Sequence, residues 1–94
     1  MNKYESVIII NSSVEEAGIK ALIQKFETLI NANGKVESIE ELGKKRLAYL
    51  VKKQKEGYYV IINFEANPNS IAELERVYKI TDEIIKFIII KKEK

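Results

Sequence analysis

Apolar residues in this chain repeat with two different periods, and the order in which the periods alternate constrains the fold more than any other feature. Over residues 14–31, and again from residue 67 onward, they recur every three or four positions, which predicts two helices. Four other stretches are rich in β-branched and aromatic residues, which is typical of strands. The predicted strands cover residues 7–10, 36–51, 58–64 and 84–90.

The resulting order is strand, helix, strand, strand, helix, strand, which is the split βαβ or ferredoxin-like pattern. We therefore predict an α+β fold, a βαββαβ sandwich with a four-stranded antiparallel sheet and both helices on one face. Ninety-four residues leave room for one domain. We expect this domain to span residues 1–94, with residues 91–94 as a solvated tail.

Turn and cap residues support the boundaries of these elements. Ser13 and Glu16 match a capping box at the start of the first helix, and Gly34 is placed to end that helix as a left-handed C-cap. Gly43 interrupts the apolar alternation of its strand, which indicates a bulge or bend. The polar residues 52–57 are expected to form the turn of a β-hairpin.

The composition excludes most catalytic and metal chemistry. The chain has neither cysteine nor histidine, so it lacks thiolates, disulfides and the commonest general base and metal ligand. No phosphate-binding glycine loop occurs either. We expect no catalytic residue, no metal, no cofactor and no small-molecule substrate. The apolar runs are far shorter than the ~20 residues of a membrane span or the ~7–15 residues of a signal-peptide core, which predicts a cytoplasmic protein without membrane contact.

Three of the predicted strands are apolar on both faces, although two helices can cover only one face of the sheet. Neighbouring strand residues point to opposite faces, so the uncovered face receives every second residue of each apolar run. We predict an uncovered apolar surface made of Val7, Ile9, Tyr59, Ile61, Ile88 and Ile90. Isolated monomers seldom expose patches above a few hundred Å², so another protein, a second copy or stacked nucleic-acid bases are expected to cover it. The alternative is a sheet surface that is merely rich in Ile.

Basic residues are concentrated in one segment, although the net charge is only +2. No acidic residue lies between Glu41 and Glu56. Six of the sixteen basic residues lie there, namely Lys44, Lys45, Arg46, Lys52, Lys53 and Lys55. Such a cluster attracts phosphates. The alternative is that these lysines protect edge strands and turns from pairing with other chains.

The third predicted strand invites comparison with RNA-recognition motifs, which share this fold and stack bases on aromatic side chains. Their consensus is a basic residue, Gly, an aromatic, Gly or Ala, and a second aromatic. Gly57 and Tyr58 match it, but Glu56 replaces the basic residue and Val60 replaces the second aromatic. We therefore expect the uncovered face to bind a protein rather than stacked bases.

The segment from Gly43 to Lys52, Gly-Lys-Lys-Arg-Leu-Ala-Tyr-Leu-Val-Lys, resembles the signature of the bacterial small-subunit ribosomal protein S6 family. The resemblance covers nearly the whole chain. One departure is Val51, where the family usually has Ile, a small change in volume. Further matching segments are Lys3-Tyr4-Glu5, Glu40-Glu41-Leu42 and Glu56-Gly57-Tyr58-Tyr59.

The resemblance implies a structural protein of the small ribosomal subunit, cytoplasmic and without enzymatic activity. It also implies binding to the central domain of the small-subunit ribosomal RNA together with ribosomal protein S18. We expect the uncovered apolar surface to dock that protein and the combined surface to bind RNA through phosphate and 2′-OH contacts. Arg46 can instead pair with the partner protein, and the sheet face of Tyr49 stays open. The predicted RNA-binding residues are Asn2, Lys3, Tyr4, Lys44, Lys45, Arg46, Lys52 and Lys53.

Two alternative classes use the same fold. In a homodimeric regulatory module, two such sheets pack face to face and bind a small ligand. An acylphosphatase-like enzyme needs a catalytic arginine in the loop after the first strand, where Asn11-Ser12-Ser13 stands instead. The two arginines, Arg46 and Arg76, lie elsewhere in the sequence, which argues against that enzyme.

Overall fold

The computed structural model describes residues 2–51 and 54–92, and their side chains except at 48–51 and 54. Its elements follow in the predicted order. They are β1 (Asn2–Asn11), α1 (Glu16–Asn33), β2 (Gly34–Val51), β3 (Gln54–Ala66), α2 (Pro68–Ile80) and β4 (Ile84–Lys91). In this described part of the chain, neither helix is both long and apolar enough to cross a membrane.

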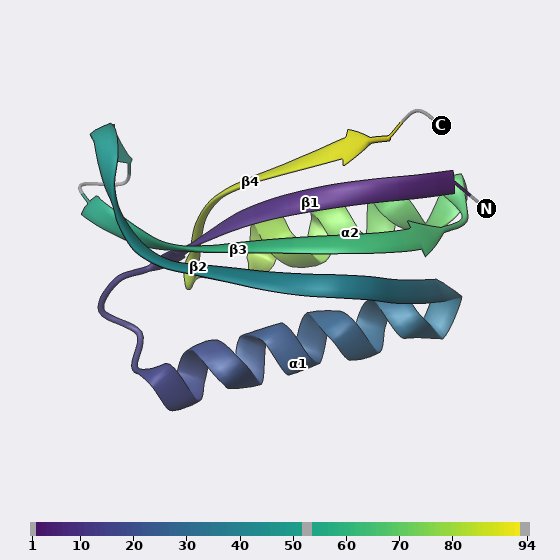
Figure 1. Cartoon of the computed structure of the whole chain (residues 1–94), viewed down its shortest axis with the longest axis horizontal. Helices are drawn as coiled ribbons and strands as arrows, with labels where there is room; N and C mark the ends of the chain where they lie inside the picture. The colour runs from purple at the N-terminus through teal and green to yellow at the C-terminus, as the bar shows by residue number, and fades with distance from the viewer. Residues whose placement is uncertain (1, 52–53, 93–94) are drawn as a thin grey trace.

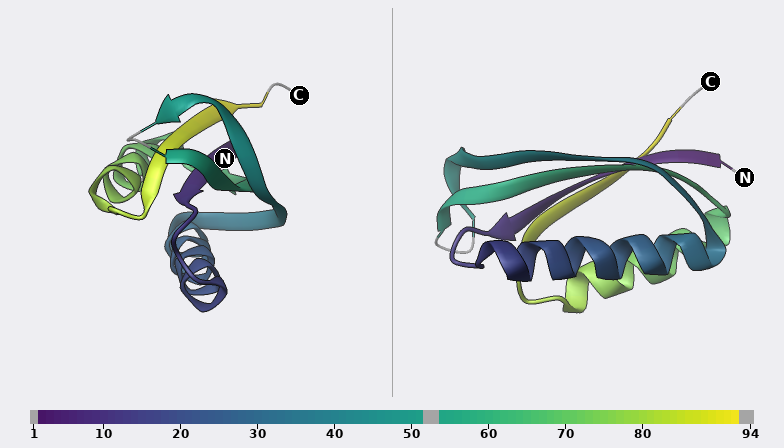
Figure 2. Two further views of the ribbon diagram at one scale, coloured as in Figure 1. Left: turned by 90° about the vertical axis from the view of Figure 1, so that its left-hand side faces the viewer. Right: turned by 60° about the horizontal axis from the view of Figure 1, so that its bottom comes forward.

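The strands form one antiparallel sheet with the order β2-β3-β1-β4. β1 and β3 therefore lie in the centre, and β2 and β4 are the edges. Both helices pack on the same face of the sheet, which we call the covered face; the opposite one is the open face (Figure 1, Figure 2). This arrangement confirms the predicted ferredoxin-like βαββαβ fold.

The core lies between the covered face and the two helices. Val60, Ile62 and Phe64 of β3 are fully buried there, and so is Phe26 of α1. The ring of Phe26 meets the ring of Tyr78 edge-on, with the ring centroids 4.9 Å apart. The alternation predicted for β3 is therefore confirmed, because every second residue from Val60 to Phe64 faces the helices.

One hydrogen-bonded pair of side chains crosses this core. The hydroxyl groups of Ser6 on β1 and Tyr78 on α2 are both buried and lie 3.0 Å apart. Burial raises the pKa of Tyr78 to about 12, and the hydrogen bond with Ser6 opposes that shift. Each hydroxyl satisfies the other, which removes the cost of burying a polar group without a partner.

The start of α1 differs from the prediction. The N–H and the hydroxyl of Ser13 both donate to Oδ1 of Asn11, at 2.9 Å each. Ser13 therefore belongs to a turn after β1. The Asn11 side chain accepts from the backbone two residues ahead, as Asn side chains commonly do in turns. α1 begins at Glu16, and Glu15 occupies the cap position without a side-chain cap bond. The predicted capping box is wrong.

Gly34 is extended, with φ of −175°, and is not the left-handed C-cap that we predicted. It is the first residue of β2 and lies opposite Ala66 of β3. A Cβ placed on Gly34 would lie 2.1 Å from the carbonyl oxygen of Glu65. Glycine is therefore required here because the β3 backbone approaches closely.

β2 is an irregular strand that extends beyond the rest of the sheet. Its pairing with β3 shifts register around Glu37 and Leu42, and Gly43 has a positive φ of 84°. The predicted bulge at Gly43 is therefore confirmed. Gly57 of β3 lies opposite Asn11 at the end of β1. Beyond this point β2 and β3 continue as a two-stranded hairpin (Figure 1).

The polar turn predicted at residues 52–57 and the tail predicted at residues 91–94 both contain residues that belong to or bond with the sheet. β3 begins at Gln54, so residues 54–57 belong to the strand and not to the turn. β4 includes Lys91, and the N–H of Lys92 donates to the carbonyl of Lys3 at 2.8 Å. Lys91 therefore belongs to β4 and the backbone of Lys92 is bonded to β1, so these two residues do not form the predicted solvated tail. Residues 93–94 lie outside the described residues.

Candidate protein-docking and nucleic-acid interface

Most residues of the predicted apolar surface lie accessible on the open face. In the middle of the sheet, Val7 of β1 lies opposite Ile61 of β3 on one side and Ile88 of β4 on the other. Ile88 and Ile90 are each 48% exposed, whereas Val7, Tyr59 and Ile61 are half-buried. We use the name apolar patch for Val7, Tyr59, Ile61, Ile88 and Ile90.

Ile9 was expected on the same surface, but it is only 7% exposed in the single chain. That prediction is wrong for a local reason. A Cβ placed on Gly57 would lie 2.2 Å from Cγ2 of Ile9 and 3.5 Å from Cδ1 of Ile85, so both isoleucine side chains lie against this glycine. The β1–β4 pairing shifts just after Ile9 and leaves Ile85 without a paired residue. The resulting bulge lets Ile85 cover Ile9.

One exposed apolar residue beside the patch was missed by sequence reasoning. Leu42 lies in the β2 bulge, next to Gly43, which is opposite Tyr59. Its side chain is exposed. The break in alternation at Gly43 is the available signal, because a bulged residue leaves the regular two-residue pattern of a strand.

A network of polar contacts adjoins the apolar patch at one end of the open face. The ammonium group of Lys92 donates to Oδ1 of Asn63 and lies 3.9 Å from Oε1 of Glu5. The amide nitrogen of Asn63 donates to the hydroxyl of Ser38 at 3.0 Å. These contacts join side chains from β1, β2, β3 and the residue that follows β4.

The N-terminal group of predicted RNA-binding residues is divided between the two faces. Lys3 lies on the open face, with its ammonium group 3.7 Å from Oε2 of Glu37. Tyr4 points into the core, where it is 6% exposed and its ring stacks on Phe64 at 5.6 Å. Tyr4 is therefore not a surface residue as we predicted, because it occupies the alternate position to Lys3. The side-chain amide of Asn2 donates to the hydroxyl of Tyr4 at 3.4 Å.

The other predicted RNA-binding group on the described residues, Lys44, Lys45 and Arg46, lies where β2 extends beyond the four-stranded sheet. We call it the second basic group, and Lys3 represents the first. Lys44, Lys45 and Arg46 are all exposed and pair with residues 56–58 of β3. Because adjacent strand residues point to opposite faces, Lys45 lies on the side of the open face. Lys44 and Arg46 lie on the side of the helices. The second basic group thus has positive charge on both sides of the hairpin.

Another basic residue of the predicted cluster, Lys55, lies on β3 beyond the four-stranded sheet. Lys55 is exposed, and together with Arg46 it borders a shallow surface depression. The predicted RNA-binding residues Lys52 and Lys53 lie outside the described residues, as does the side chain of Tyr49. The RNA-binding role of Lys52 and Lys53 stays a prediction from the sequence, and the sheet face of Tyr49 stays open.

The two basic groups do not form one continuous stripe. On β3, Lys3 lies opposite Glu65 and Lys45 lies opposite Gly57. Eight residues of extended strand separate these positions, which corresponds to roughly 26 Å. The apolar patch lies between the two groups, so Lys3, which is paired with Glu37, stands at one end of the patch and Lys45 at the other.

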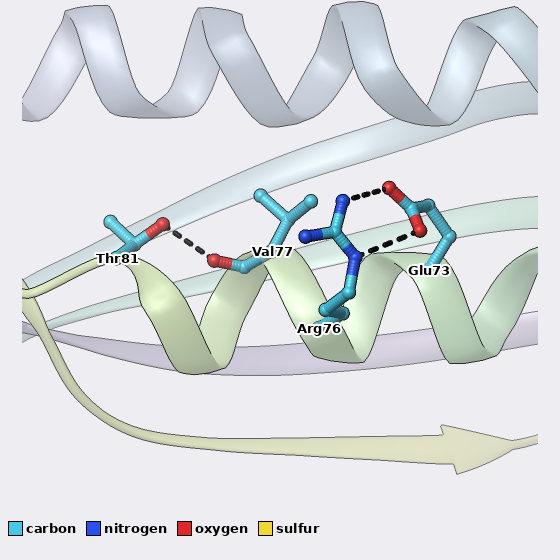
Figure 3. A network of polar contacts seen from close by, with 4 residues as sticks. All are labelled: Glu73, Arg76, Val77 and Thr81. Atoms are coloured by element: carbon cyan, nitrogen blue, oxygen red, sulfur yellow. Dashed lines mark hydrogen bonds and ion pairs between the residues drawn. The ribbon is translucent and has the colours of Figure 1, made fainter.

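The second arginine is engaged in the helix layer. Figure 3 shows Arg76 of α2 donating from Nε and Nη2 to the carboxylate of Glu73, at 3.0 and 2.5 Å. These hydrogen bonds lower the pKa of Glu73 and raise the pKa of Arg76. In the same view the hydroxyl of Thr81 donates to the carbonyl of Val77 at 2.6 Å, where α2 ends. Arg76 therefore joins neither basic group.

The aromatic residues of β3 do not form a surface for stacking bases. Tyr58 and Val60 lie on the covered side, where the Tyr58 hydroxyl donates to Oε1 of Glu41 at 2.9 Å and this bond raises the pKa of Tyr58. Tyr59 is the member of this run that lies on the open face. Even an aromatic residue in place of Val60 would face the helices. Within residues 2–51 and 54–92, no group of three or more acidic side chains is arranged to hold a metal ion.

Known proteins match the sequence along its whole length. A family model described as Ribosomal protein S6 matches residues 3–91. The small ribosomal subunit protein bS6 of Clostridium perfringens strain SM101 is 49% identical over 94 residues, which cover 99% of each chain. The protein of the same name from Clostridium kluyveri strain ATCC 8527 is 45% identical over 95 residues, which cover 100% of each chain.

Solved structures match the fold. The crystal structure of 30S ribosomal protein S6 from Thermotoga maritima has a TM-score of 0.93 and 32% identity, covering 97% of this chain and 87% of that chain. A protein of Arabidopsis thaliana has a TM-score of 0.59 and 15% identity, covering 100% of this chain and 95% of that chain. At that identity the second likeness concerns the fold alone.

Proposed function

Because this chain belongs to the ribosomal protein S6 family and is therefore a small-subunit ribosomal protein, we propose that it binds the central domain of the small-subunit ribosomal RNA together with ribosomal protein S18. In this proposal the apolar patch docks S18, and the two basic groups contact phosphates. The chain acts on the ribosome, in the cytoplasm, as a structural component without catalytic activity.

The observation that carries the proposal is the position of the apolar patch between two basic groups. Ile88 and Ile90 are half exposed in the single chain, and covering them gains about 25 cal/mol per Å² of apolar surface, offset by the entropy of association. Lys3 and Lys45 flank the patch at its two ends. A protein seated on the patch therefore has the exposed Lys45 beside it at one end and Lys3, paired with Glu37, at the other.

The same charges predict weak RNA binding by the chain alone. The net charge is +2, and Lys3 is already paired with Glu37. About four phosphate contacts would give a slope of about −3 for the logarithm of affinity against that of salt concentration. When the chain and S18 bind RNA as one complex, the RNA contacts of both proteins form in a single association step. We therefore expect the two proteins to bind the RNA cooperatively.

A filter-binding titration of central-domain RNA with and without S18 tests the proposal. We expect the chain to bind about 5–150-fold more tightly when S18 is present, the usual range of coupling between two ligands. Lys45→Gln should weaken binding and reduce the salt slope by about 1. Lys25→Gln, an exposed lysine on α1, is the matched control and should change neither. Equal RNA affinity with and without S18 would contradict the proposal.

A second copy of the chain is the competing occupant of the apolar patch. Light scattering of the isolated protein distinguishes the two occupants. A monomer at micromolar concentration supports docking of S18. A stable dimer at that concentration, tightened by a small ligand, would instead support the homodimeric regulatory module.

A further inference from the structure

A carboxylate stands at the edge of the apolar patch, where a docked protein would cover it. Glu5 lies two residues before Val7 on the same face of β1 and opposite Ile90 of β4. Its side chain is 33% exposed. A partner seated on Val7 and Ile90 therefore removes water from Glu5, and a buried carboxylate without a counter-charge strongly opposes docking.

Lys92 supplies that counter-charge from within the chain. Its ammonium group lies 3.9 Å from Oε1 of Glu5 and donates to Oδ1 of Asn63. Ser38 accepts a hydrogen bond from the Asn63 amide nitrogen at 3.0 Å, which turns the amide oxygen toward Lys92. The N–H of Lys92 donates to the carbonyl of Lys3 at 2.8 Å. The sheet therefore holds the base of the Lys92 side chain in place.

On the basis of the docking function proposed above, we propose that Lys92 is a built-in part of the docking face: it neutralises Glu5, so the face receives an apolar, uncharged segment of the partner protein beside Ile90. The ammonium group of Lys92 is already engaged by both neighbours, in an ion pair with Glu5 and a hydrogen bond to Asn63. A partner lysine or arginine at this point would meet the charge of Lys92, and like charges across an interface repel. The counter-charge for Glu5 therefore comes from Lys92 of the same chain and not from the partner protein.

A double-mutant cycle on Glu5 and Lys92 tests this role. Calorimetric titrations with S18 compare the unchanged chain with Lys92→Met, Glu5→Gln and the double variant. Lys92→Met keeps an unbranched apolar stem but leaves Glu5 without its counter-charge, and we expect S18 binding to weaken about tenfold or more. In the Glu5→Gln background no counter-charge is needed, so adding Lys92→Met should change the affinity less than about threefold.

Lys91→Met is the matched control for the loss of one positive charge. Lys91 is the neighbouring exposed lysine and lies opposite Tyr4, on the other side of the sheet, so its replacement should change the affinity less than about threefold. If Lys92→Met leaves S18 binding unchanged or strengthens it, the partner brings its own cation and the proposal is overturned. Equal weakening by Lys92→Met in both backgrounds also overturns it, because Glu5 is then not involved.

Ile88→Asp separates this proposal from the proposed function. If Ile88→Asp leaves S18 binding unchanged, the open face is not the docking surface, and both proposals fail. If Ile88→Asp weakens binding strongly but the Lys92 cycle shows no coupling, only the role of Lys92 is overturned. Thermal unfolding of every variant is the check on folding, and a Tm within about 4 °C of the unchanged chain shows that the native state is kept.

Discussion

The two faces of the sheet contain the same kinds of side chain but differ in what covers them. On β1, Ile8 is fully buried under the helices, while the adjacent Val7 is half-buried on the open face. On β4, Phe87 packs against the core, while Ile88 is 48% exposed. The hydrophobicity of a strand therefore does not determine which of its faces is sealed; the position of the helices does.

The two faces also differ in the interactions that hold them. The covered face has close packing and the satisfied hydroxyl pair of Ser6 and Tyr78. On the open face, the ion pair between Lys3 and Glu37 is long, at 3.7 Å, and partly exposed. Exposed ion pairs contribute only about 0–1 kcal/mol. Stability therefore resides mainly on the covered face, which leaves the open face free to be selected for binding.

The largest effect is expected when a ring is removed from the covered face. Phe64→Ala should lower the free energy of unfolding by about 3–5 kcal/mol, because Phe64 is fully buried and its ring stacks on Tyr4. Urea unfolding followed by circular dichroism measures this change. A loss below about 1 kcal/mol, which is ordinary for a less critical position, would show that the helices do not seal this face.

An intermediate effect, also from the covered face, is expected at alkaline pH. Burial raises the pKa of Tyr78 from 10.0 to about 12 in the folded chain. Between these values the unfolded chain releases the phenolic proton and the folded chain keeps it. Stability therefore falls as pH rises from 10 to 12, by about 2–3 kcal/mol. Below pH 10 both states keep the proton, and Tyr78 contributes no pH dependence.

Tyr78→Phe is the control for this pH dependence, measured by urea unfolding at pH 8, 10, 11 and 12. The variant loses about 1 kcal/mol at pH 8, because the buried Ser6 hydroxyl loses its partner. Its stability should then fall less steeply than that of the unchanged chain above pH 10. Equal slopes for the two proteins would contradict the assignment of this alkaline loss to Tyr78.

The smallest effect on stability is expected from a charge on the open face. Ile88→Asp should lower the free energy of unfolding by only about 1 kcal/mol, because Ile88 is 48% exposed and the loss comes mainly from strand propensity and partial packing. The same variant should weaken S18 binding at least about tenfold, as for a residue at the centre of an interface. Urea unfolding and calorimetric titration measure the two quantities. A stability loss as large as that of Phe64→Ala would erase the distinction between the faces.

β3 shows which parts of this fold can be predicted from sequence. Its alternation is regular, so Val60 was correctly assigned to the covered face and Ile61 to the open face. Ile9 could not be assigned in the same way. Its burial depends on the missing side chain of Gly57 across the sheet and on Ile85 beyond a shift in pairing. The alternation of apolar residues within β1 cannot predict either of these contacts, because both are made with other strands.

The candidate site was predictable where the signal is local and not where it depends on the sheet register. The run Lys44-Lys45-Arg46 is evident as a cluster of charge, and the structure places all three side chains at the surface. Lys92 was assigned to a solvated tail because its acceptor Asn63 is 29 residues away in sequence. The pairing of β1 with both β3 and β4 brings Lys92 and Asn63 together. No short sequence motif predicts this contact.

The two edge strands of the sheet differ in how readily they can pair with a strand from another copy of the chain. A strand added at an edge needs an unbroken row of backbone donors and acceptors. β2 breaks that row around Glu37 and Leu42, whereas β4 pairs with β1 in regular register from Lys86 to Lys91. Between those lysines lies the apolar run 87–90, the kind of segment that favours cross-β assembly. We therefore expect copies of concentrated protein to add strand to strand at β4, with Lys86 and Lys91 as the charges that oppose such growth.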